Sequence, residues 1–165
     1  MKLIIFILYI LVFLPSSSVA EWYLDINGPD VFGEKSASVT ADFIGNTDLI
    51  RMQCKSNGDY SFSWLIKTNE PMPNVRSLTG DILMKGDMGA SGQVSAKLLA
   101  WNEKYIALSS FNDPIIIKLL DGIASAQSKI NFGYLIPEID AKASGTSLAI
   151  NANFAIGKFK SHCGL

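Results

Sequence analysis

The sequence is poor in the residues from which many catalytic and metal sites are built. It contains one histidine, His162, and two cysteines, Cys54 and Cys163, among 165 residues. A zinc site normally draws on several His or Cys ligands, and the G-x-S-x-G elbow of many serine hydrolases is absent. We therefore predict no catalytic residue, no metal and no cofactor, and interpret His162 as a favourable charge near a helix carboxyl end.

Nucleotide and nucleic-acid binding are also disfavoured. The glycine-rich stretch at residues 86–92 lacks the G-K-[ST] ending of a phosphate loop. The 14 basic residues are balanced by 15 acidic ones, and a nucleic-acid partner needs a basic stripe that displaces counterions. The motif Asn-x-Ser/Thr occurs nowhere, which suits a bacterial envelope protein.

The acidic residues leave one enzymatic alternative open. A pair of carboxylates with raised pKa in one cleft can support hydrolysis. The sequence does not bring two of them together, and we expect most to be solvated. The scattered acids are Glu21, Asp25, Asp30, Glu34, Glu70, Glu103 and Glu138.

The amino terminus has the pattern of a secretory signal peptide. Lys2 supplies a positive charge, residues 3–14 are an apolar run, and Ser18 and Ala20 place small side chains before Glu21. The alternative is a membrane anchor, but twelve residues are short of the about 20 that span the hydrocarbon core. We predict that residues 1–20 are cleaved.

The remaining residues, 21–165, have the length of one domain. Cleavage removes Lys2, so the exported chain keeps 13 of the 14 Lys and Arg residues and all 15 Asp and Glu residues. No later segment reaches spanning length, so we predict no transmembrane anchor after cleavage and a periplasmic or secreted location.

Both cysteines lie in this exported part, and an even pair in an oxidising compartment is typical of a disulfide. A Cys54–Cys163 bridge closes a loop of about 110 residues, for which the chain-entropy model gives about 4–5 kcal/mol. The alternative is a redox pair, which usually has C-x-x-C spacing.

The clearest local pattern is a β-hairpin. Apolar residues alternate along 49–54 and again along 60–66, and Asn57-Gly58 between them favours a type I′ turn. We predict further strands at 21–27, 36–43, 81–85, 93–101, 105–110, 129–136 and 147–151, with loops at 68–80 and 86–92.

Two segments have helical patterns. Asp113 and Pro114 suit the start of a helix running to about Gln127, with an apolar stripe of Ile116, Leu119, Leu120 and Ile123. A short helix is predicted from Asn153 to a C-cap at Gly164. The sequence therefore predicts an α+β domain: mainly antiparallel sheet with one amphipathic helix packed on it and a short C-terminal helix, closed by one disulfide.

Exposed aromatic and loop residues are the candidates for a contact surface. Trp22 and Tyr23 are adjacent, so in a strand they point to opposite faces. Loops on a rigid sheet often carry recognition. The predicted contact residues are Trp22, Tyr23, Met72, Arg76 and Met88.

The strand LIRMQC at 49–54 and the ending Ser161-His162-Cys163-Gly164 resemble those of small bacterial exported proteins. These are the invasion-associated-locus-B-like proteins and periplasmic accessory proteins of type VI secretion. The resemblance spans about residues 45–165. It implies an envelope accessory protein that works by contact, with Cys54 and Cys163 as a structural bridge.

These observations favour a non-enzymatic, exported binding or accessory protein whose partner is another envelope or secreted protein. An inhibitor or immunity protein that blocks a secreted cell-wall-active enzyme is the alternative.

Overall fold

The computed structural model describes residues 21–68 and 78–165, which form nine strands and two α-helices. The predicted signal peptide at 1–20 lies outside these residues. The strands are β1 (Trp22–Asn27), β2 (Ser36–Asp42), β3 (Leu49–Lys55), β4 (Tyr60–Lys67), β5 (Thr79–Gly86), β6 (Ser91–Ala100), β7 (Tyr105–Phe111), β8 (Lys129–Ile136) and β9 (Ala141–Leu148). The helices are α2 (Pro114–Ser125), the 3-10 turn η2 (Pro137–Ile139) and α3 (Ala152–Cys163).

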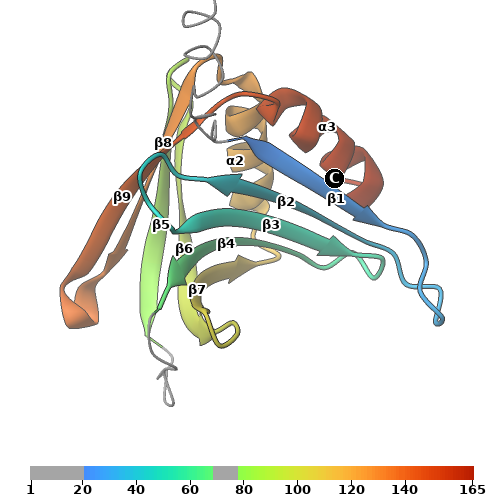
Figure 1. Cartoon of the computed structure of the whole chain (residues 1–165), viewed down its shortest axis with the longest axis horizontal. Helices are drawn as coiled ribbons and strands as arrows, with labels where there is room; N and C mark the ends of the chain where they lie inside the picture. Colours follow the sequence, from blue (N-terminus) through green and yellow to red (C-terminus); the bar gives the residue numbers. More distant parts are fainter. Residues whose placement is uncertain (1–20, 69–77) are drawn as a thin grey trace, which may run out of the picture.

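The nine strands form one antiparallel sheet in the order β1-β2-β3-β4-β7-β6-β5-β8-β9. The sheet is strongly bent, and both helices lie against it on one side (Figure 1). Helix α2 packs on β5 and β6, α3 packs on β1 and β2, and the helices contact each other. The predicted fold class is confirmed.

The core lies between the helices and the inner face of the sheet. The predicted α2 stripe is at most 1% exposed, and Asp113 caps this helix by accepting a hydrogen bond from the backbone N–H of Ile115. Burying one such aliphatic side chain contributes about 1.5–3 kcal/mol. Inward strand residues alternate with outward ones, and the largest buried side chains from the sheet are Trp64, Phe62, Ile50, Met52, Ile82, Leu108 and Ile130.

The bend brings the two ends of the sheet together. The backbone N–H of Ile44, just after β2, donates to the carbonyl of Thr146 in β9 at 2.8 Å. The indole Nε1 of Trp22 in β1 donates to the carbonyl of Leu148 at 2.8 Å. These bonds connect β1 and the segment after β2 with β9, so the two edges of the sheet meet.

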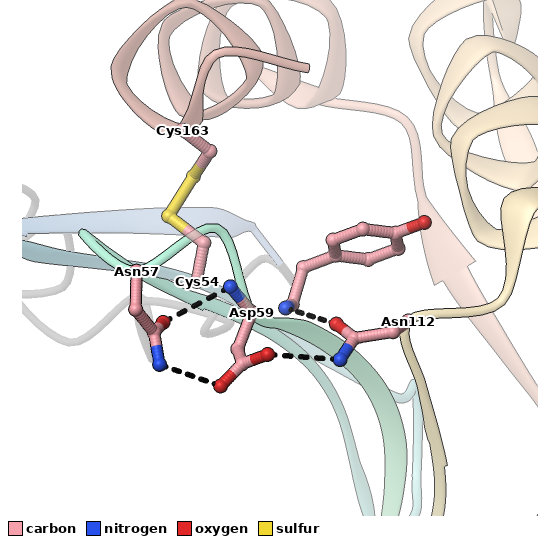
Figure 2. The surroundings of a disulfide bond; sticks show 6 residues. Cys54, Asn57, Asp59, Asn112 and Cys163 are labelled. Carbon is pink, nitrogen blue, oxygen red and sulfur yellow. Dashed lines mark hydrogen bonds between the residues drawn. A yellow bond between two sulfur atoms is a disulfide. The ribbon is translucent and has the colours of Figure 1, made fainter.

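The predicted disulfide is confirmed. Cys54 at the end of β3 is bonded to Cys163 at the end of α3, with Cα atoms 6.0 Å apart and a sequence separation of 109. The bond attaches the last helix to the edge of the core, as Figure 2 shows.

The predicted type I′ turn after β3 is wrong. It requires positive φ at two residues, but between β3 and β4 only Gly58 has one, at 87°. The Lys55 N–H donates to the Asp59 carbonyl, which leaves a loop of Ser56, Asn57 and Gly58. A loop of this length uses a left-handed glycine at its last position.

Two other boundaries also differ. The strand predicted at 147–151 is β9, at Ala141–Leu148. Its inward positions are Ala141, Ala143, Gly145 and Ser147, which give little apolar alternation to detect. The loop predicted at 86–92 is a tight turn at 87–90, because β5 ends at Gly86 and β6 begins at Ser91.

Candidate functional site

The predicted contact residues differ in how exposed they are in the structure. Trp22 is 3% exposed and belongs to the core, so its prediction as a contact residue is not supported by its position. Tyr23 points to the opposite face and is 51% exposed, and Met88 in the β5–β6 turn is 59% exposed. Met72 and Arg76 lie outside the described residues.

Tyr23 and Met88 lie on different elements. Tyr23 is on β1, at one edge of the sheet, whereas Met88 lies in the turn that connects β5 and β6. The two exposed residues therefore come from separate strand pairs of the sheet.

The most exposed large apolar side chains in the described residues lie at the tip of the β1–β2 hairpin. Val31 is 92% exposed and Phe32 is 85% exposed. The hairpin extends beyond the neighbouring strand ends at the right of Figure 1. Single exposed apolar residues are common on protein surfaces, but two adjacent ones at a projecting tip form a small apolar knob.

This tip is held by local hydrogen bonds. The carboxylate Oδ1 of Asp30 accepts from the N–H of Phe32 at 2.8 Å and from the N–H of Glu34 at 2.9 Å. The N–H of Gly33 donates to the Asp30 carbonyl, and the N–H of Asp30 donates to the Glu34 carbonyl. Gly33 has φ of 80°, which glycine adopts without strain. The turn therefore presents its apolar side chains in a defined geometry.

The charges beside the tip are mainly acidic. Asp30 and Glu34 flank the apolar pair, and Lys35 is the nearest basic residue along the chain. The tip thus combines an apolar end with a carboxylate on each side of it in the sequence. Such a surface complements a partner with an apolar pocket and a basic rim.

Three carboxylates also gather in a cleft of about 630 Å³ on the other half of the molecule. They belong to Asp81, Asp113 and Glu138. The pKa of Glu138 lies below its usual value because its own backbone N–H, the Thr79 hydroxyl and the Thr79 N–H donate to it. A general acid needs a raised pKa, so Glu138 is not suited to that role.

Two further acids with lowered pKa have structural partners. The Asp59 carboxylate accepts from the side-chain amides of Asn112 and Asn57, which lower its pKa. Figure 2 shows this network joining the β3–β4 turn to the end of β7, near the disulfide. Asp87 accepts from the Ser128 hydroxyl and from backbone N–H groups of 127–129, which lower its pKa.

Val31 and Phe32 were not among the predicted contact residues. A usable signal was present: an apolar pair enclosed by turn formers, Pro29-Asp30 before it and Gly33 after it. Nothing local indicated the carboxylate cleft, because Asp81 lies in β5, Asp113 at the start of α2 and Glu138 in η2.

Comparisons with protein-family models, curated proteins and solved structures found no match to this chain. No helix in residues 21–68 and 78–165 is long and apolar enough to cross a membrane. Over the same residues, no group of three or more His, Cys, Asp or Glu side chains is arranged to hold a metal ion.

Proposed function

We propose that this protein is an exported, non-enzymatic binding protein that contacts a partner protein through the tip of its β1–β2 hairpin. The observation that carries the proposal is the pair Val31 and Phe32, 92% and 85% exposed on a hydrogen-bonded turn. Interface energy concentrates in a few residues that fill pockets of the partner, and a turn that is already ordered loses little entropy on binding.

The partner is a protein with an apolar pocket rimmed by basic residues, in the periplasm or outside the cell. Its pocket would take Phe32, and the rim would face Asp30 and Glu34. The signal-peptide pattern and the Cys54–Cys163 disulfide support this location, because disulfides persist in oxidising compartments. The role is that of an accessory protein of the bacterial envelope, in keeping with the resemblance noted for residues 45–165.

The projecting shape of the tip also favours the second candidate, an inhibitor or immunity protein against a secreted wall-active enzyme. A narrow, ordered turn can enter an enzyme cleft, whereas a flat contact face cannot. The two candidates share the contact residues and differ only in the partner.

The test compares the exported protein with a Val31→Ser/Phe32→Ser variant as baits for envelope extract, followed by affinity measurement with the purified captured protein. We expect the variant to bind about 30-fold or more weakly, because truncating an interface anchor costs about 2 kcal/mol or more. Inhibition of a captured hydrolase would assign the inhibitor role.

Ile44→Ser is the matched control, since Ile44 is also an exposed aliphatic residue, at 56%. It should bind like the unaltered protein. If the tip variant and the control capture the same partner with equal affinity, the tip is not the contact surface.

A further inference from the structure

Strands β6 and β7 separate before β6 ends. Residues 97–100 of β6 pair with residues 106–109 of β7, whereas residues 91–96 of β6 pair only with β5. Strand β7 continues along β4 to Phe111, and the chain then enters α2. A gap in the hydrogen-bond ladder therefore opens beyond the Lys97–Ser109 pair.

The backbone of Ser95 points into this gap. In β6 the N–H of Leu98 donates to the carbonyl of Leu78 on the β5 side, at 2.9 Å. Successive residues of an antiparallel strand direct their backbone groups to opposite neighbours. Ser95, three residues before Leu98, therefore directs its N–H and C=O away from β5, and no hydrogen bond within the described residues uses them.

Phe111 faces the gap from the other side. The N–H of Asn112 donates to the carbonyl of Tyr60 in β4 at 3.0 Å, so the preceding residue directs its backbone groups toward β6. The register would place Phe111 opposite Ser95, but this pair is not formed. Unpaired backbone groups of an exposed strand are a template for an added strand.

The same gap forms the floor of the carboxylate cleft, which is lined by Ser95 and Phe111. Its volume of about 630 Å³ is within the range of small-ligand sites. The cleft is lined by three carboxylates, those of Asp81, Asp113 and Glu138, and by one basic residue, Lys97. The Asp81 carboxylate accepts from the Ser95 hydroxyl at 3.0 Å, and that of Glu138 accepts from the Thr79 hydroxyl at 2.8 Å, so both are held in place.

Ser110 also lines the cleft and is 5% exposed. The cleft therefore offers unpaired backbone groups and an excess of negative charge.

From these features we infer that the cleft binds an extended polypeptide segment of another protein that carries a Lys or Arg side chain. The segment adds to β6 by pairing with the N–H and C=O of Ser95, the mode known as strand addition. Its basic side chain lies among the carboxylates of Asp81, Asp113 and Glu138. The site is separate from the hairpin tip and does not depend on the tip's function.

The test titrates the exported, disulfide-bonded protein, labelled with ¹⁵N, with the capped peptide acetyl-TVKVT-amide. We expect the largest amide shifts at Ser95 and Phe111. Replacing the peptide lysine by glutamate should weaken binding about fivefold or more, because up to about that factor is lost with each exposed ion pair and the carboxylates of the cleft also repel the glutamate. Methylating the peptide backbone nitrogens should weaken it about 2- to 10-fold for each hydrogen bond lost.

Two variants of Ser95 isolate the backbone contribution. Ser95→Pro removes the N–H that faces the gap without removing a β5–β6 hydrogen bond, and proline is tolerated where an edge N–H is unpaired. Ser95→Ala keeps this N–H and loses the same hydroxyl. We expect the Pro variant to bind about 2- to 10-fold more weakly than the Ala variant, with denaturation midpoints of both recorded to verify folding.

Glu138→Gln tests the charge, with Glu103→Gln in the exposed β6–β7 turn as its control. Only the first should reduce binding of the lysine peptide. The inference is overturned if the glutamate peptide binds equally well, or if the shifts arise away from Ser95 and Phe111. It is also overturned if the cleft is occupied by a second copy of the chain, seen as concentration-dependent dimerisation, or takes chito-oligosaccharide and no peptide.

Discussion

Gly145 lies where the two ends of the sheet meet. A Cβ atom built on this residue would be 2.6 Å from the ring of Phe43. That ring cannot move away easily, because its centroid lies 4.6 Å from that of Trp64 and 5.8 Å from that of Phe132. Glycine is needed here for space, since its φ is not positive.

We therefore expect Gly145→Ala to lower the free energy of unfolding by about 1–3 kcal/mol, as overpacking of a core does. Urea denaturation measures the change. Gly157→Ala in α3 is the control, because a Cβ atom at that position would have nothing within 4 Å of it. It should stabilise the protein slightly through helix propensity. Equal midpoints for Gly145→Ala and the unaltered protein would contradict the close contact.

The buried Trp64 shows how one polar residue completes the core. Its indole N–H donates to Asp48 Oδ2 at 3.0 Å, and the other oxygen of this carboxylate accepts from the Lys67 N–H at 3.1 Å. A buried indole N–H without an acceptor would be costly. Asp48 lies outside the strands, so alternation along a strand does not identify this role.

Asp87 connects secondary-structure elements. It lies in the β5–β6 turn and accepts hydrogen bonds from the segment that joins α2 to β8. The hydroxyl of Ser128 also donates to it, and together these donors lower the pKa of Asp87 below its usual 3.8. The ionised carboxylate therefore stabilises the folded state.

This stabilisation has a definite pH dependence. Because the pKa of Asp87 is lower in the folded than in the unfolded chain, its contribution is complete above about pH 4 and is lost as the pH falls further. We expect Asp87→Asn to lower the thermal midpoint at pH 7, with a difference that shrinks below pH 4. Asp42→Asn, whose carboxylate has no hydrogen bond among the described residues, is the control. A difference that stays constant down to pH 2 would refute this role of Asp87.

The helices show why secondary-structure elements were easier to predict than the candidate site. The α2 stripe is a local pattern, since Ile116, Leu119, Leu120 and Ile123 face one direction in any helix of this register. Its capping by Asp113 is likewise local. In contrast, the separation of β6 from β7 depends on where β7 turns into α2 in three dimensions, and no periodicity in either strand encodes it.

Across the whole molecule, the disulfide is the longest-range covalent constraint. Cys54 and Cys163 are 109 residues apart, and their bond attaches α3 to β3. Helix α3 packs on β1 and β2, so without the bond the end of α3 can detach from the core that it covers there.

We expect the Cys54→Ser/Cys163→Ser variant to lose about 2–5 kcal/mol of unfolding free energy, chiefly because its unfolded chain gains conformational freedom. Equilibrium urea denaturation gives the value. A reducing agent should destabilise the unaltered protein to a similar extent and leave the variant unchanged. A reductant effect on the variant as large as that on the unaltered protein would show that another process is responsible.

Local sequence patterns were enough to predict the mixed α+β class, the Cys54–Cys163 bond, both helices with the Asp113 N-cap and the Gly164 C-cap, and most strands to within about two residues. Each of these depends on local periodicity, on capping chemistry or, for the bond, on there being only two cysteines. The bounds of strand β9 were predicted wrongly because small residues occupy its inward positions. The folded arrangement was needed for the strand order, the meeting of the sheet ends, the burial of Trp22, the exposure of Val31 and Phe32, and the cleft at Ser95 and Phe111. These depend on which distant segments pack together, and the free energy of such contacts is not contained in any single stretch of chain.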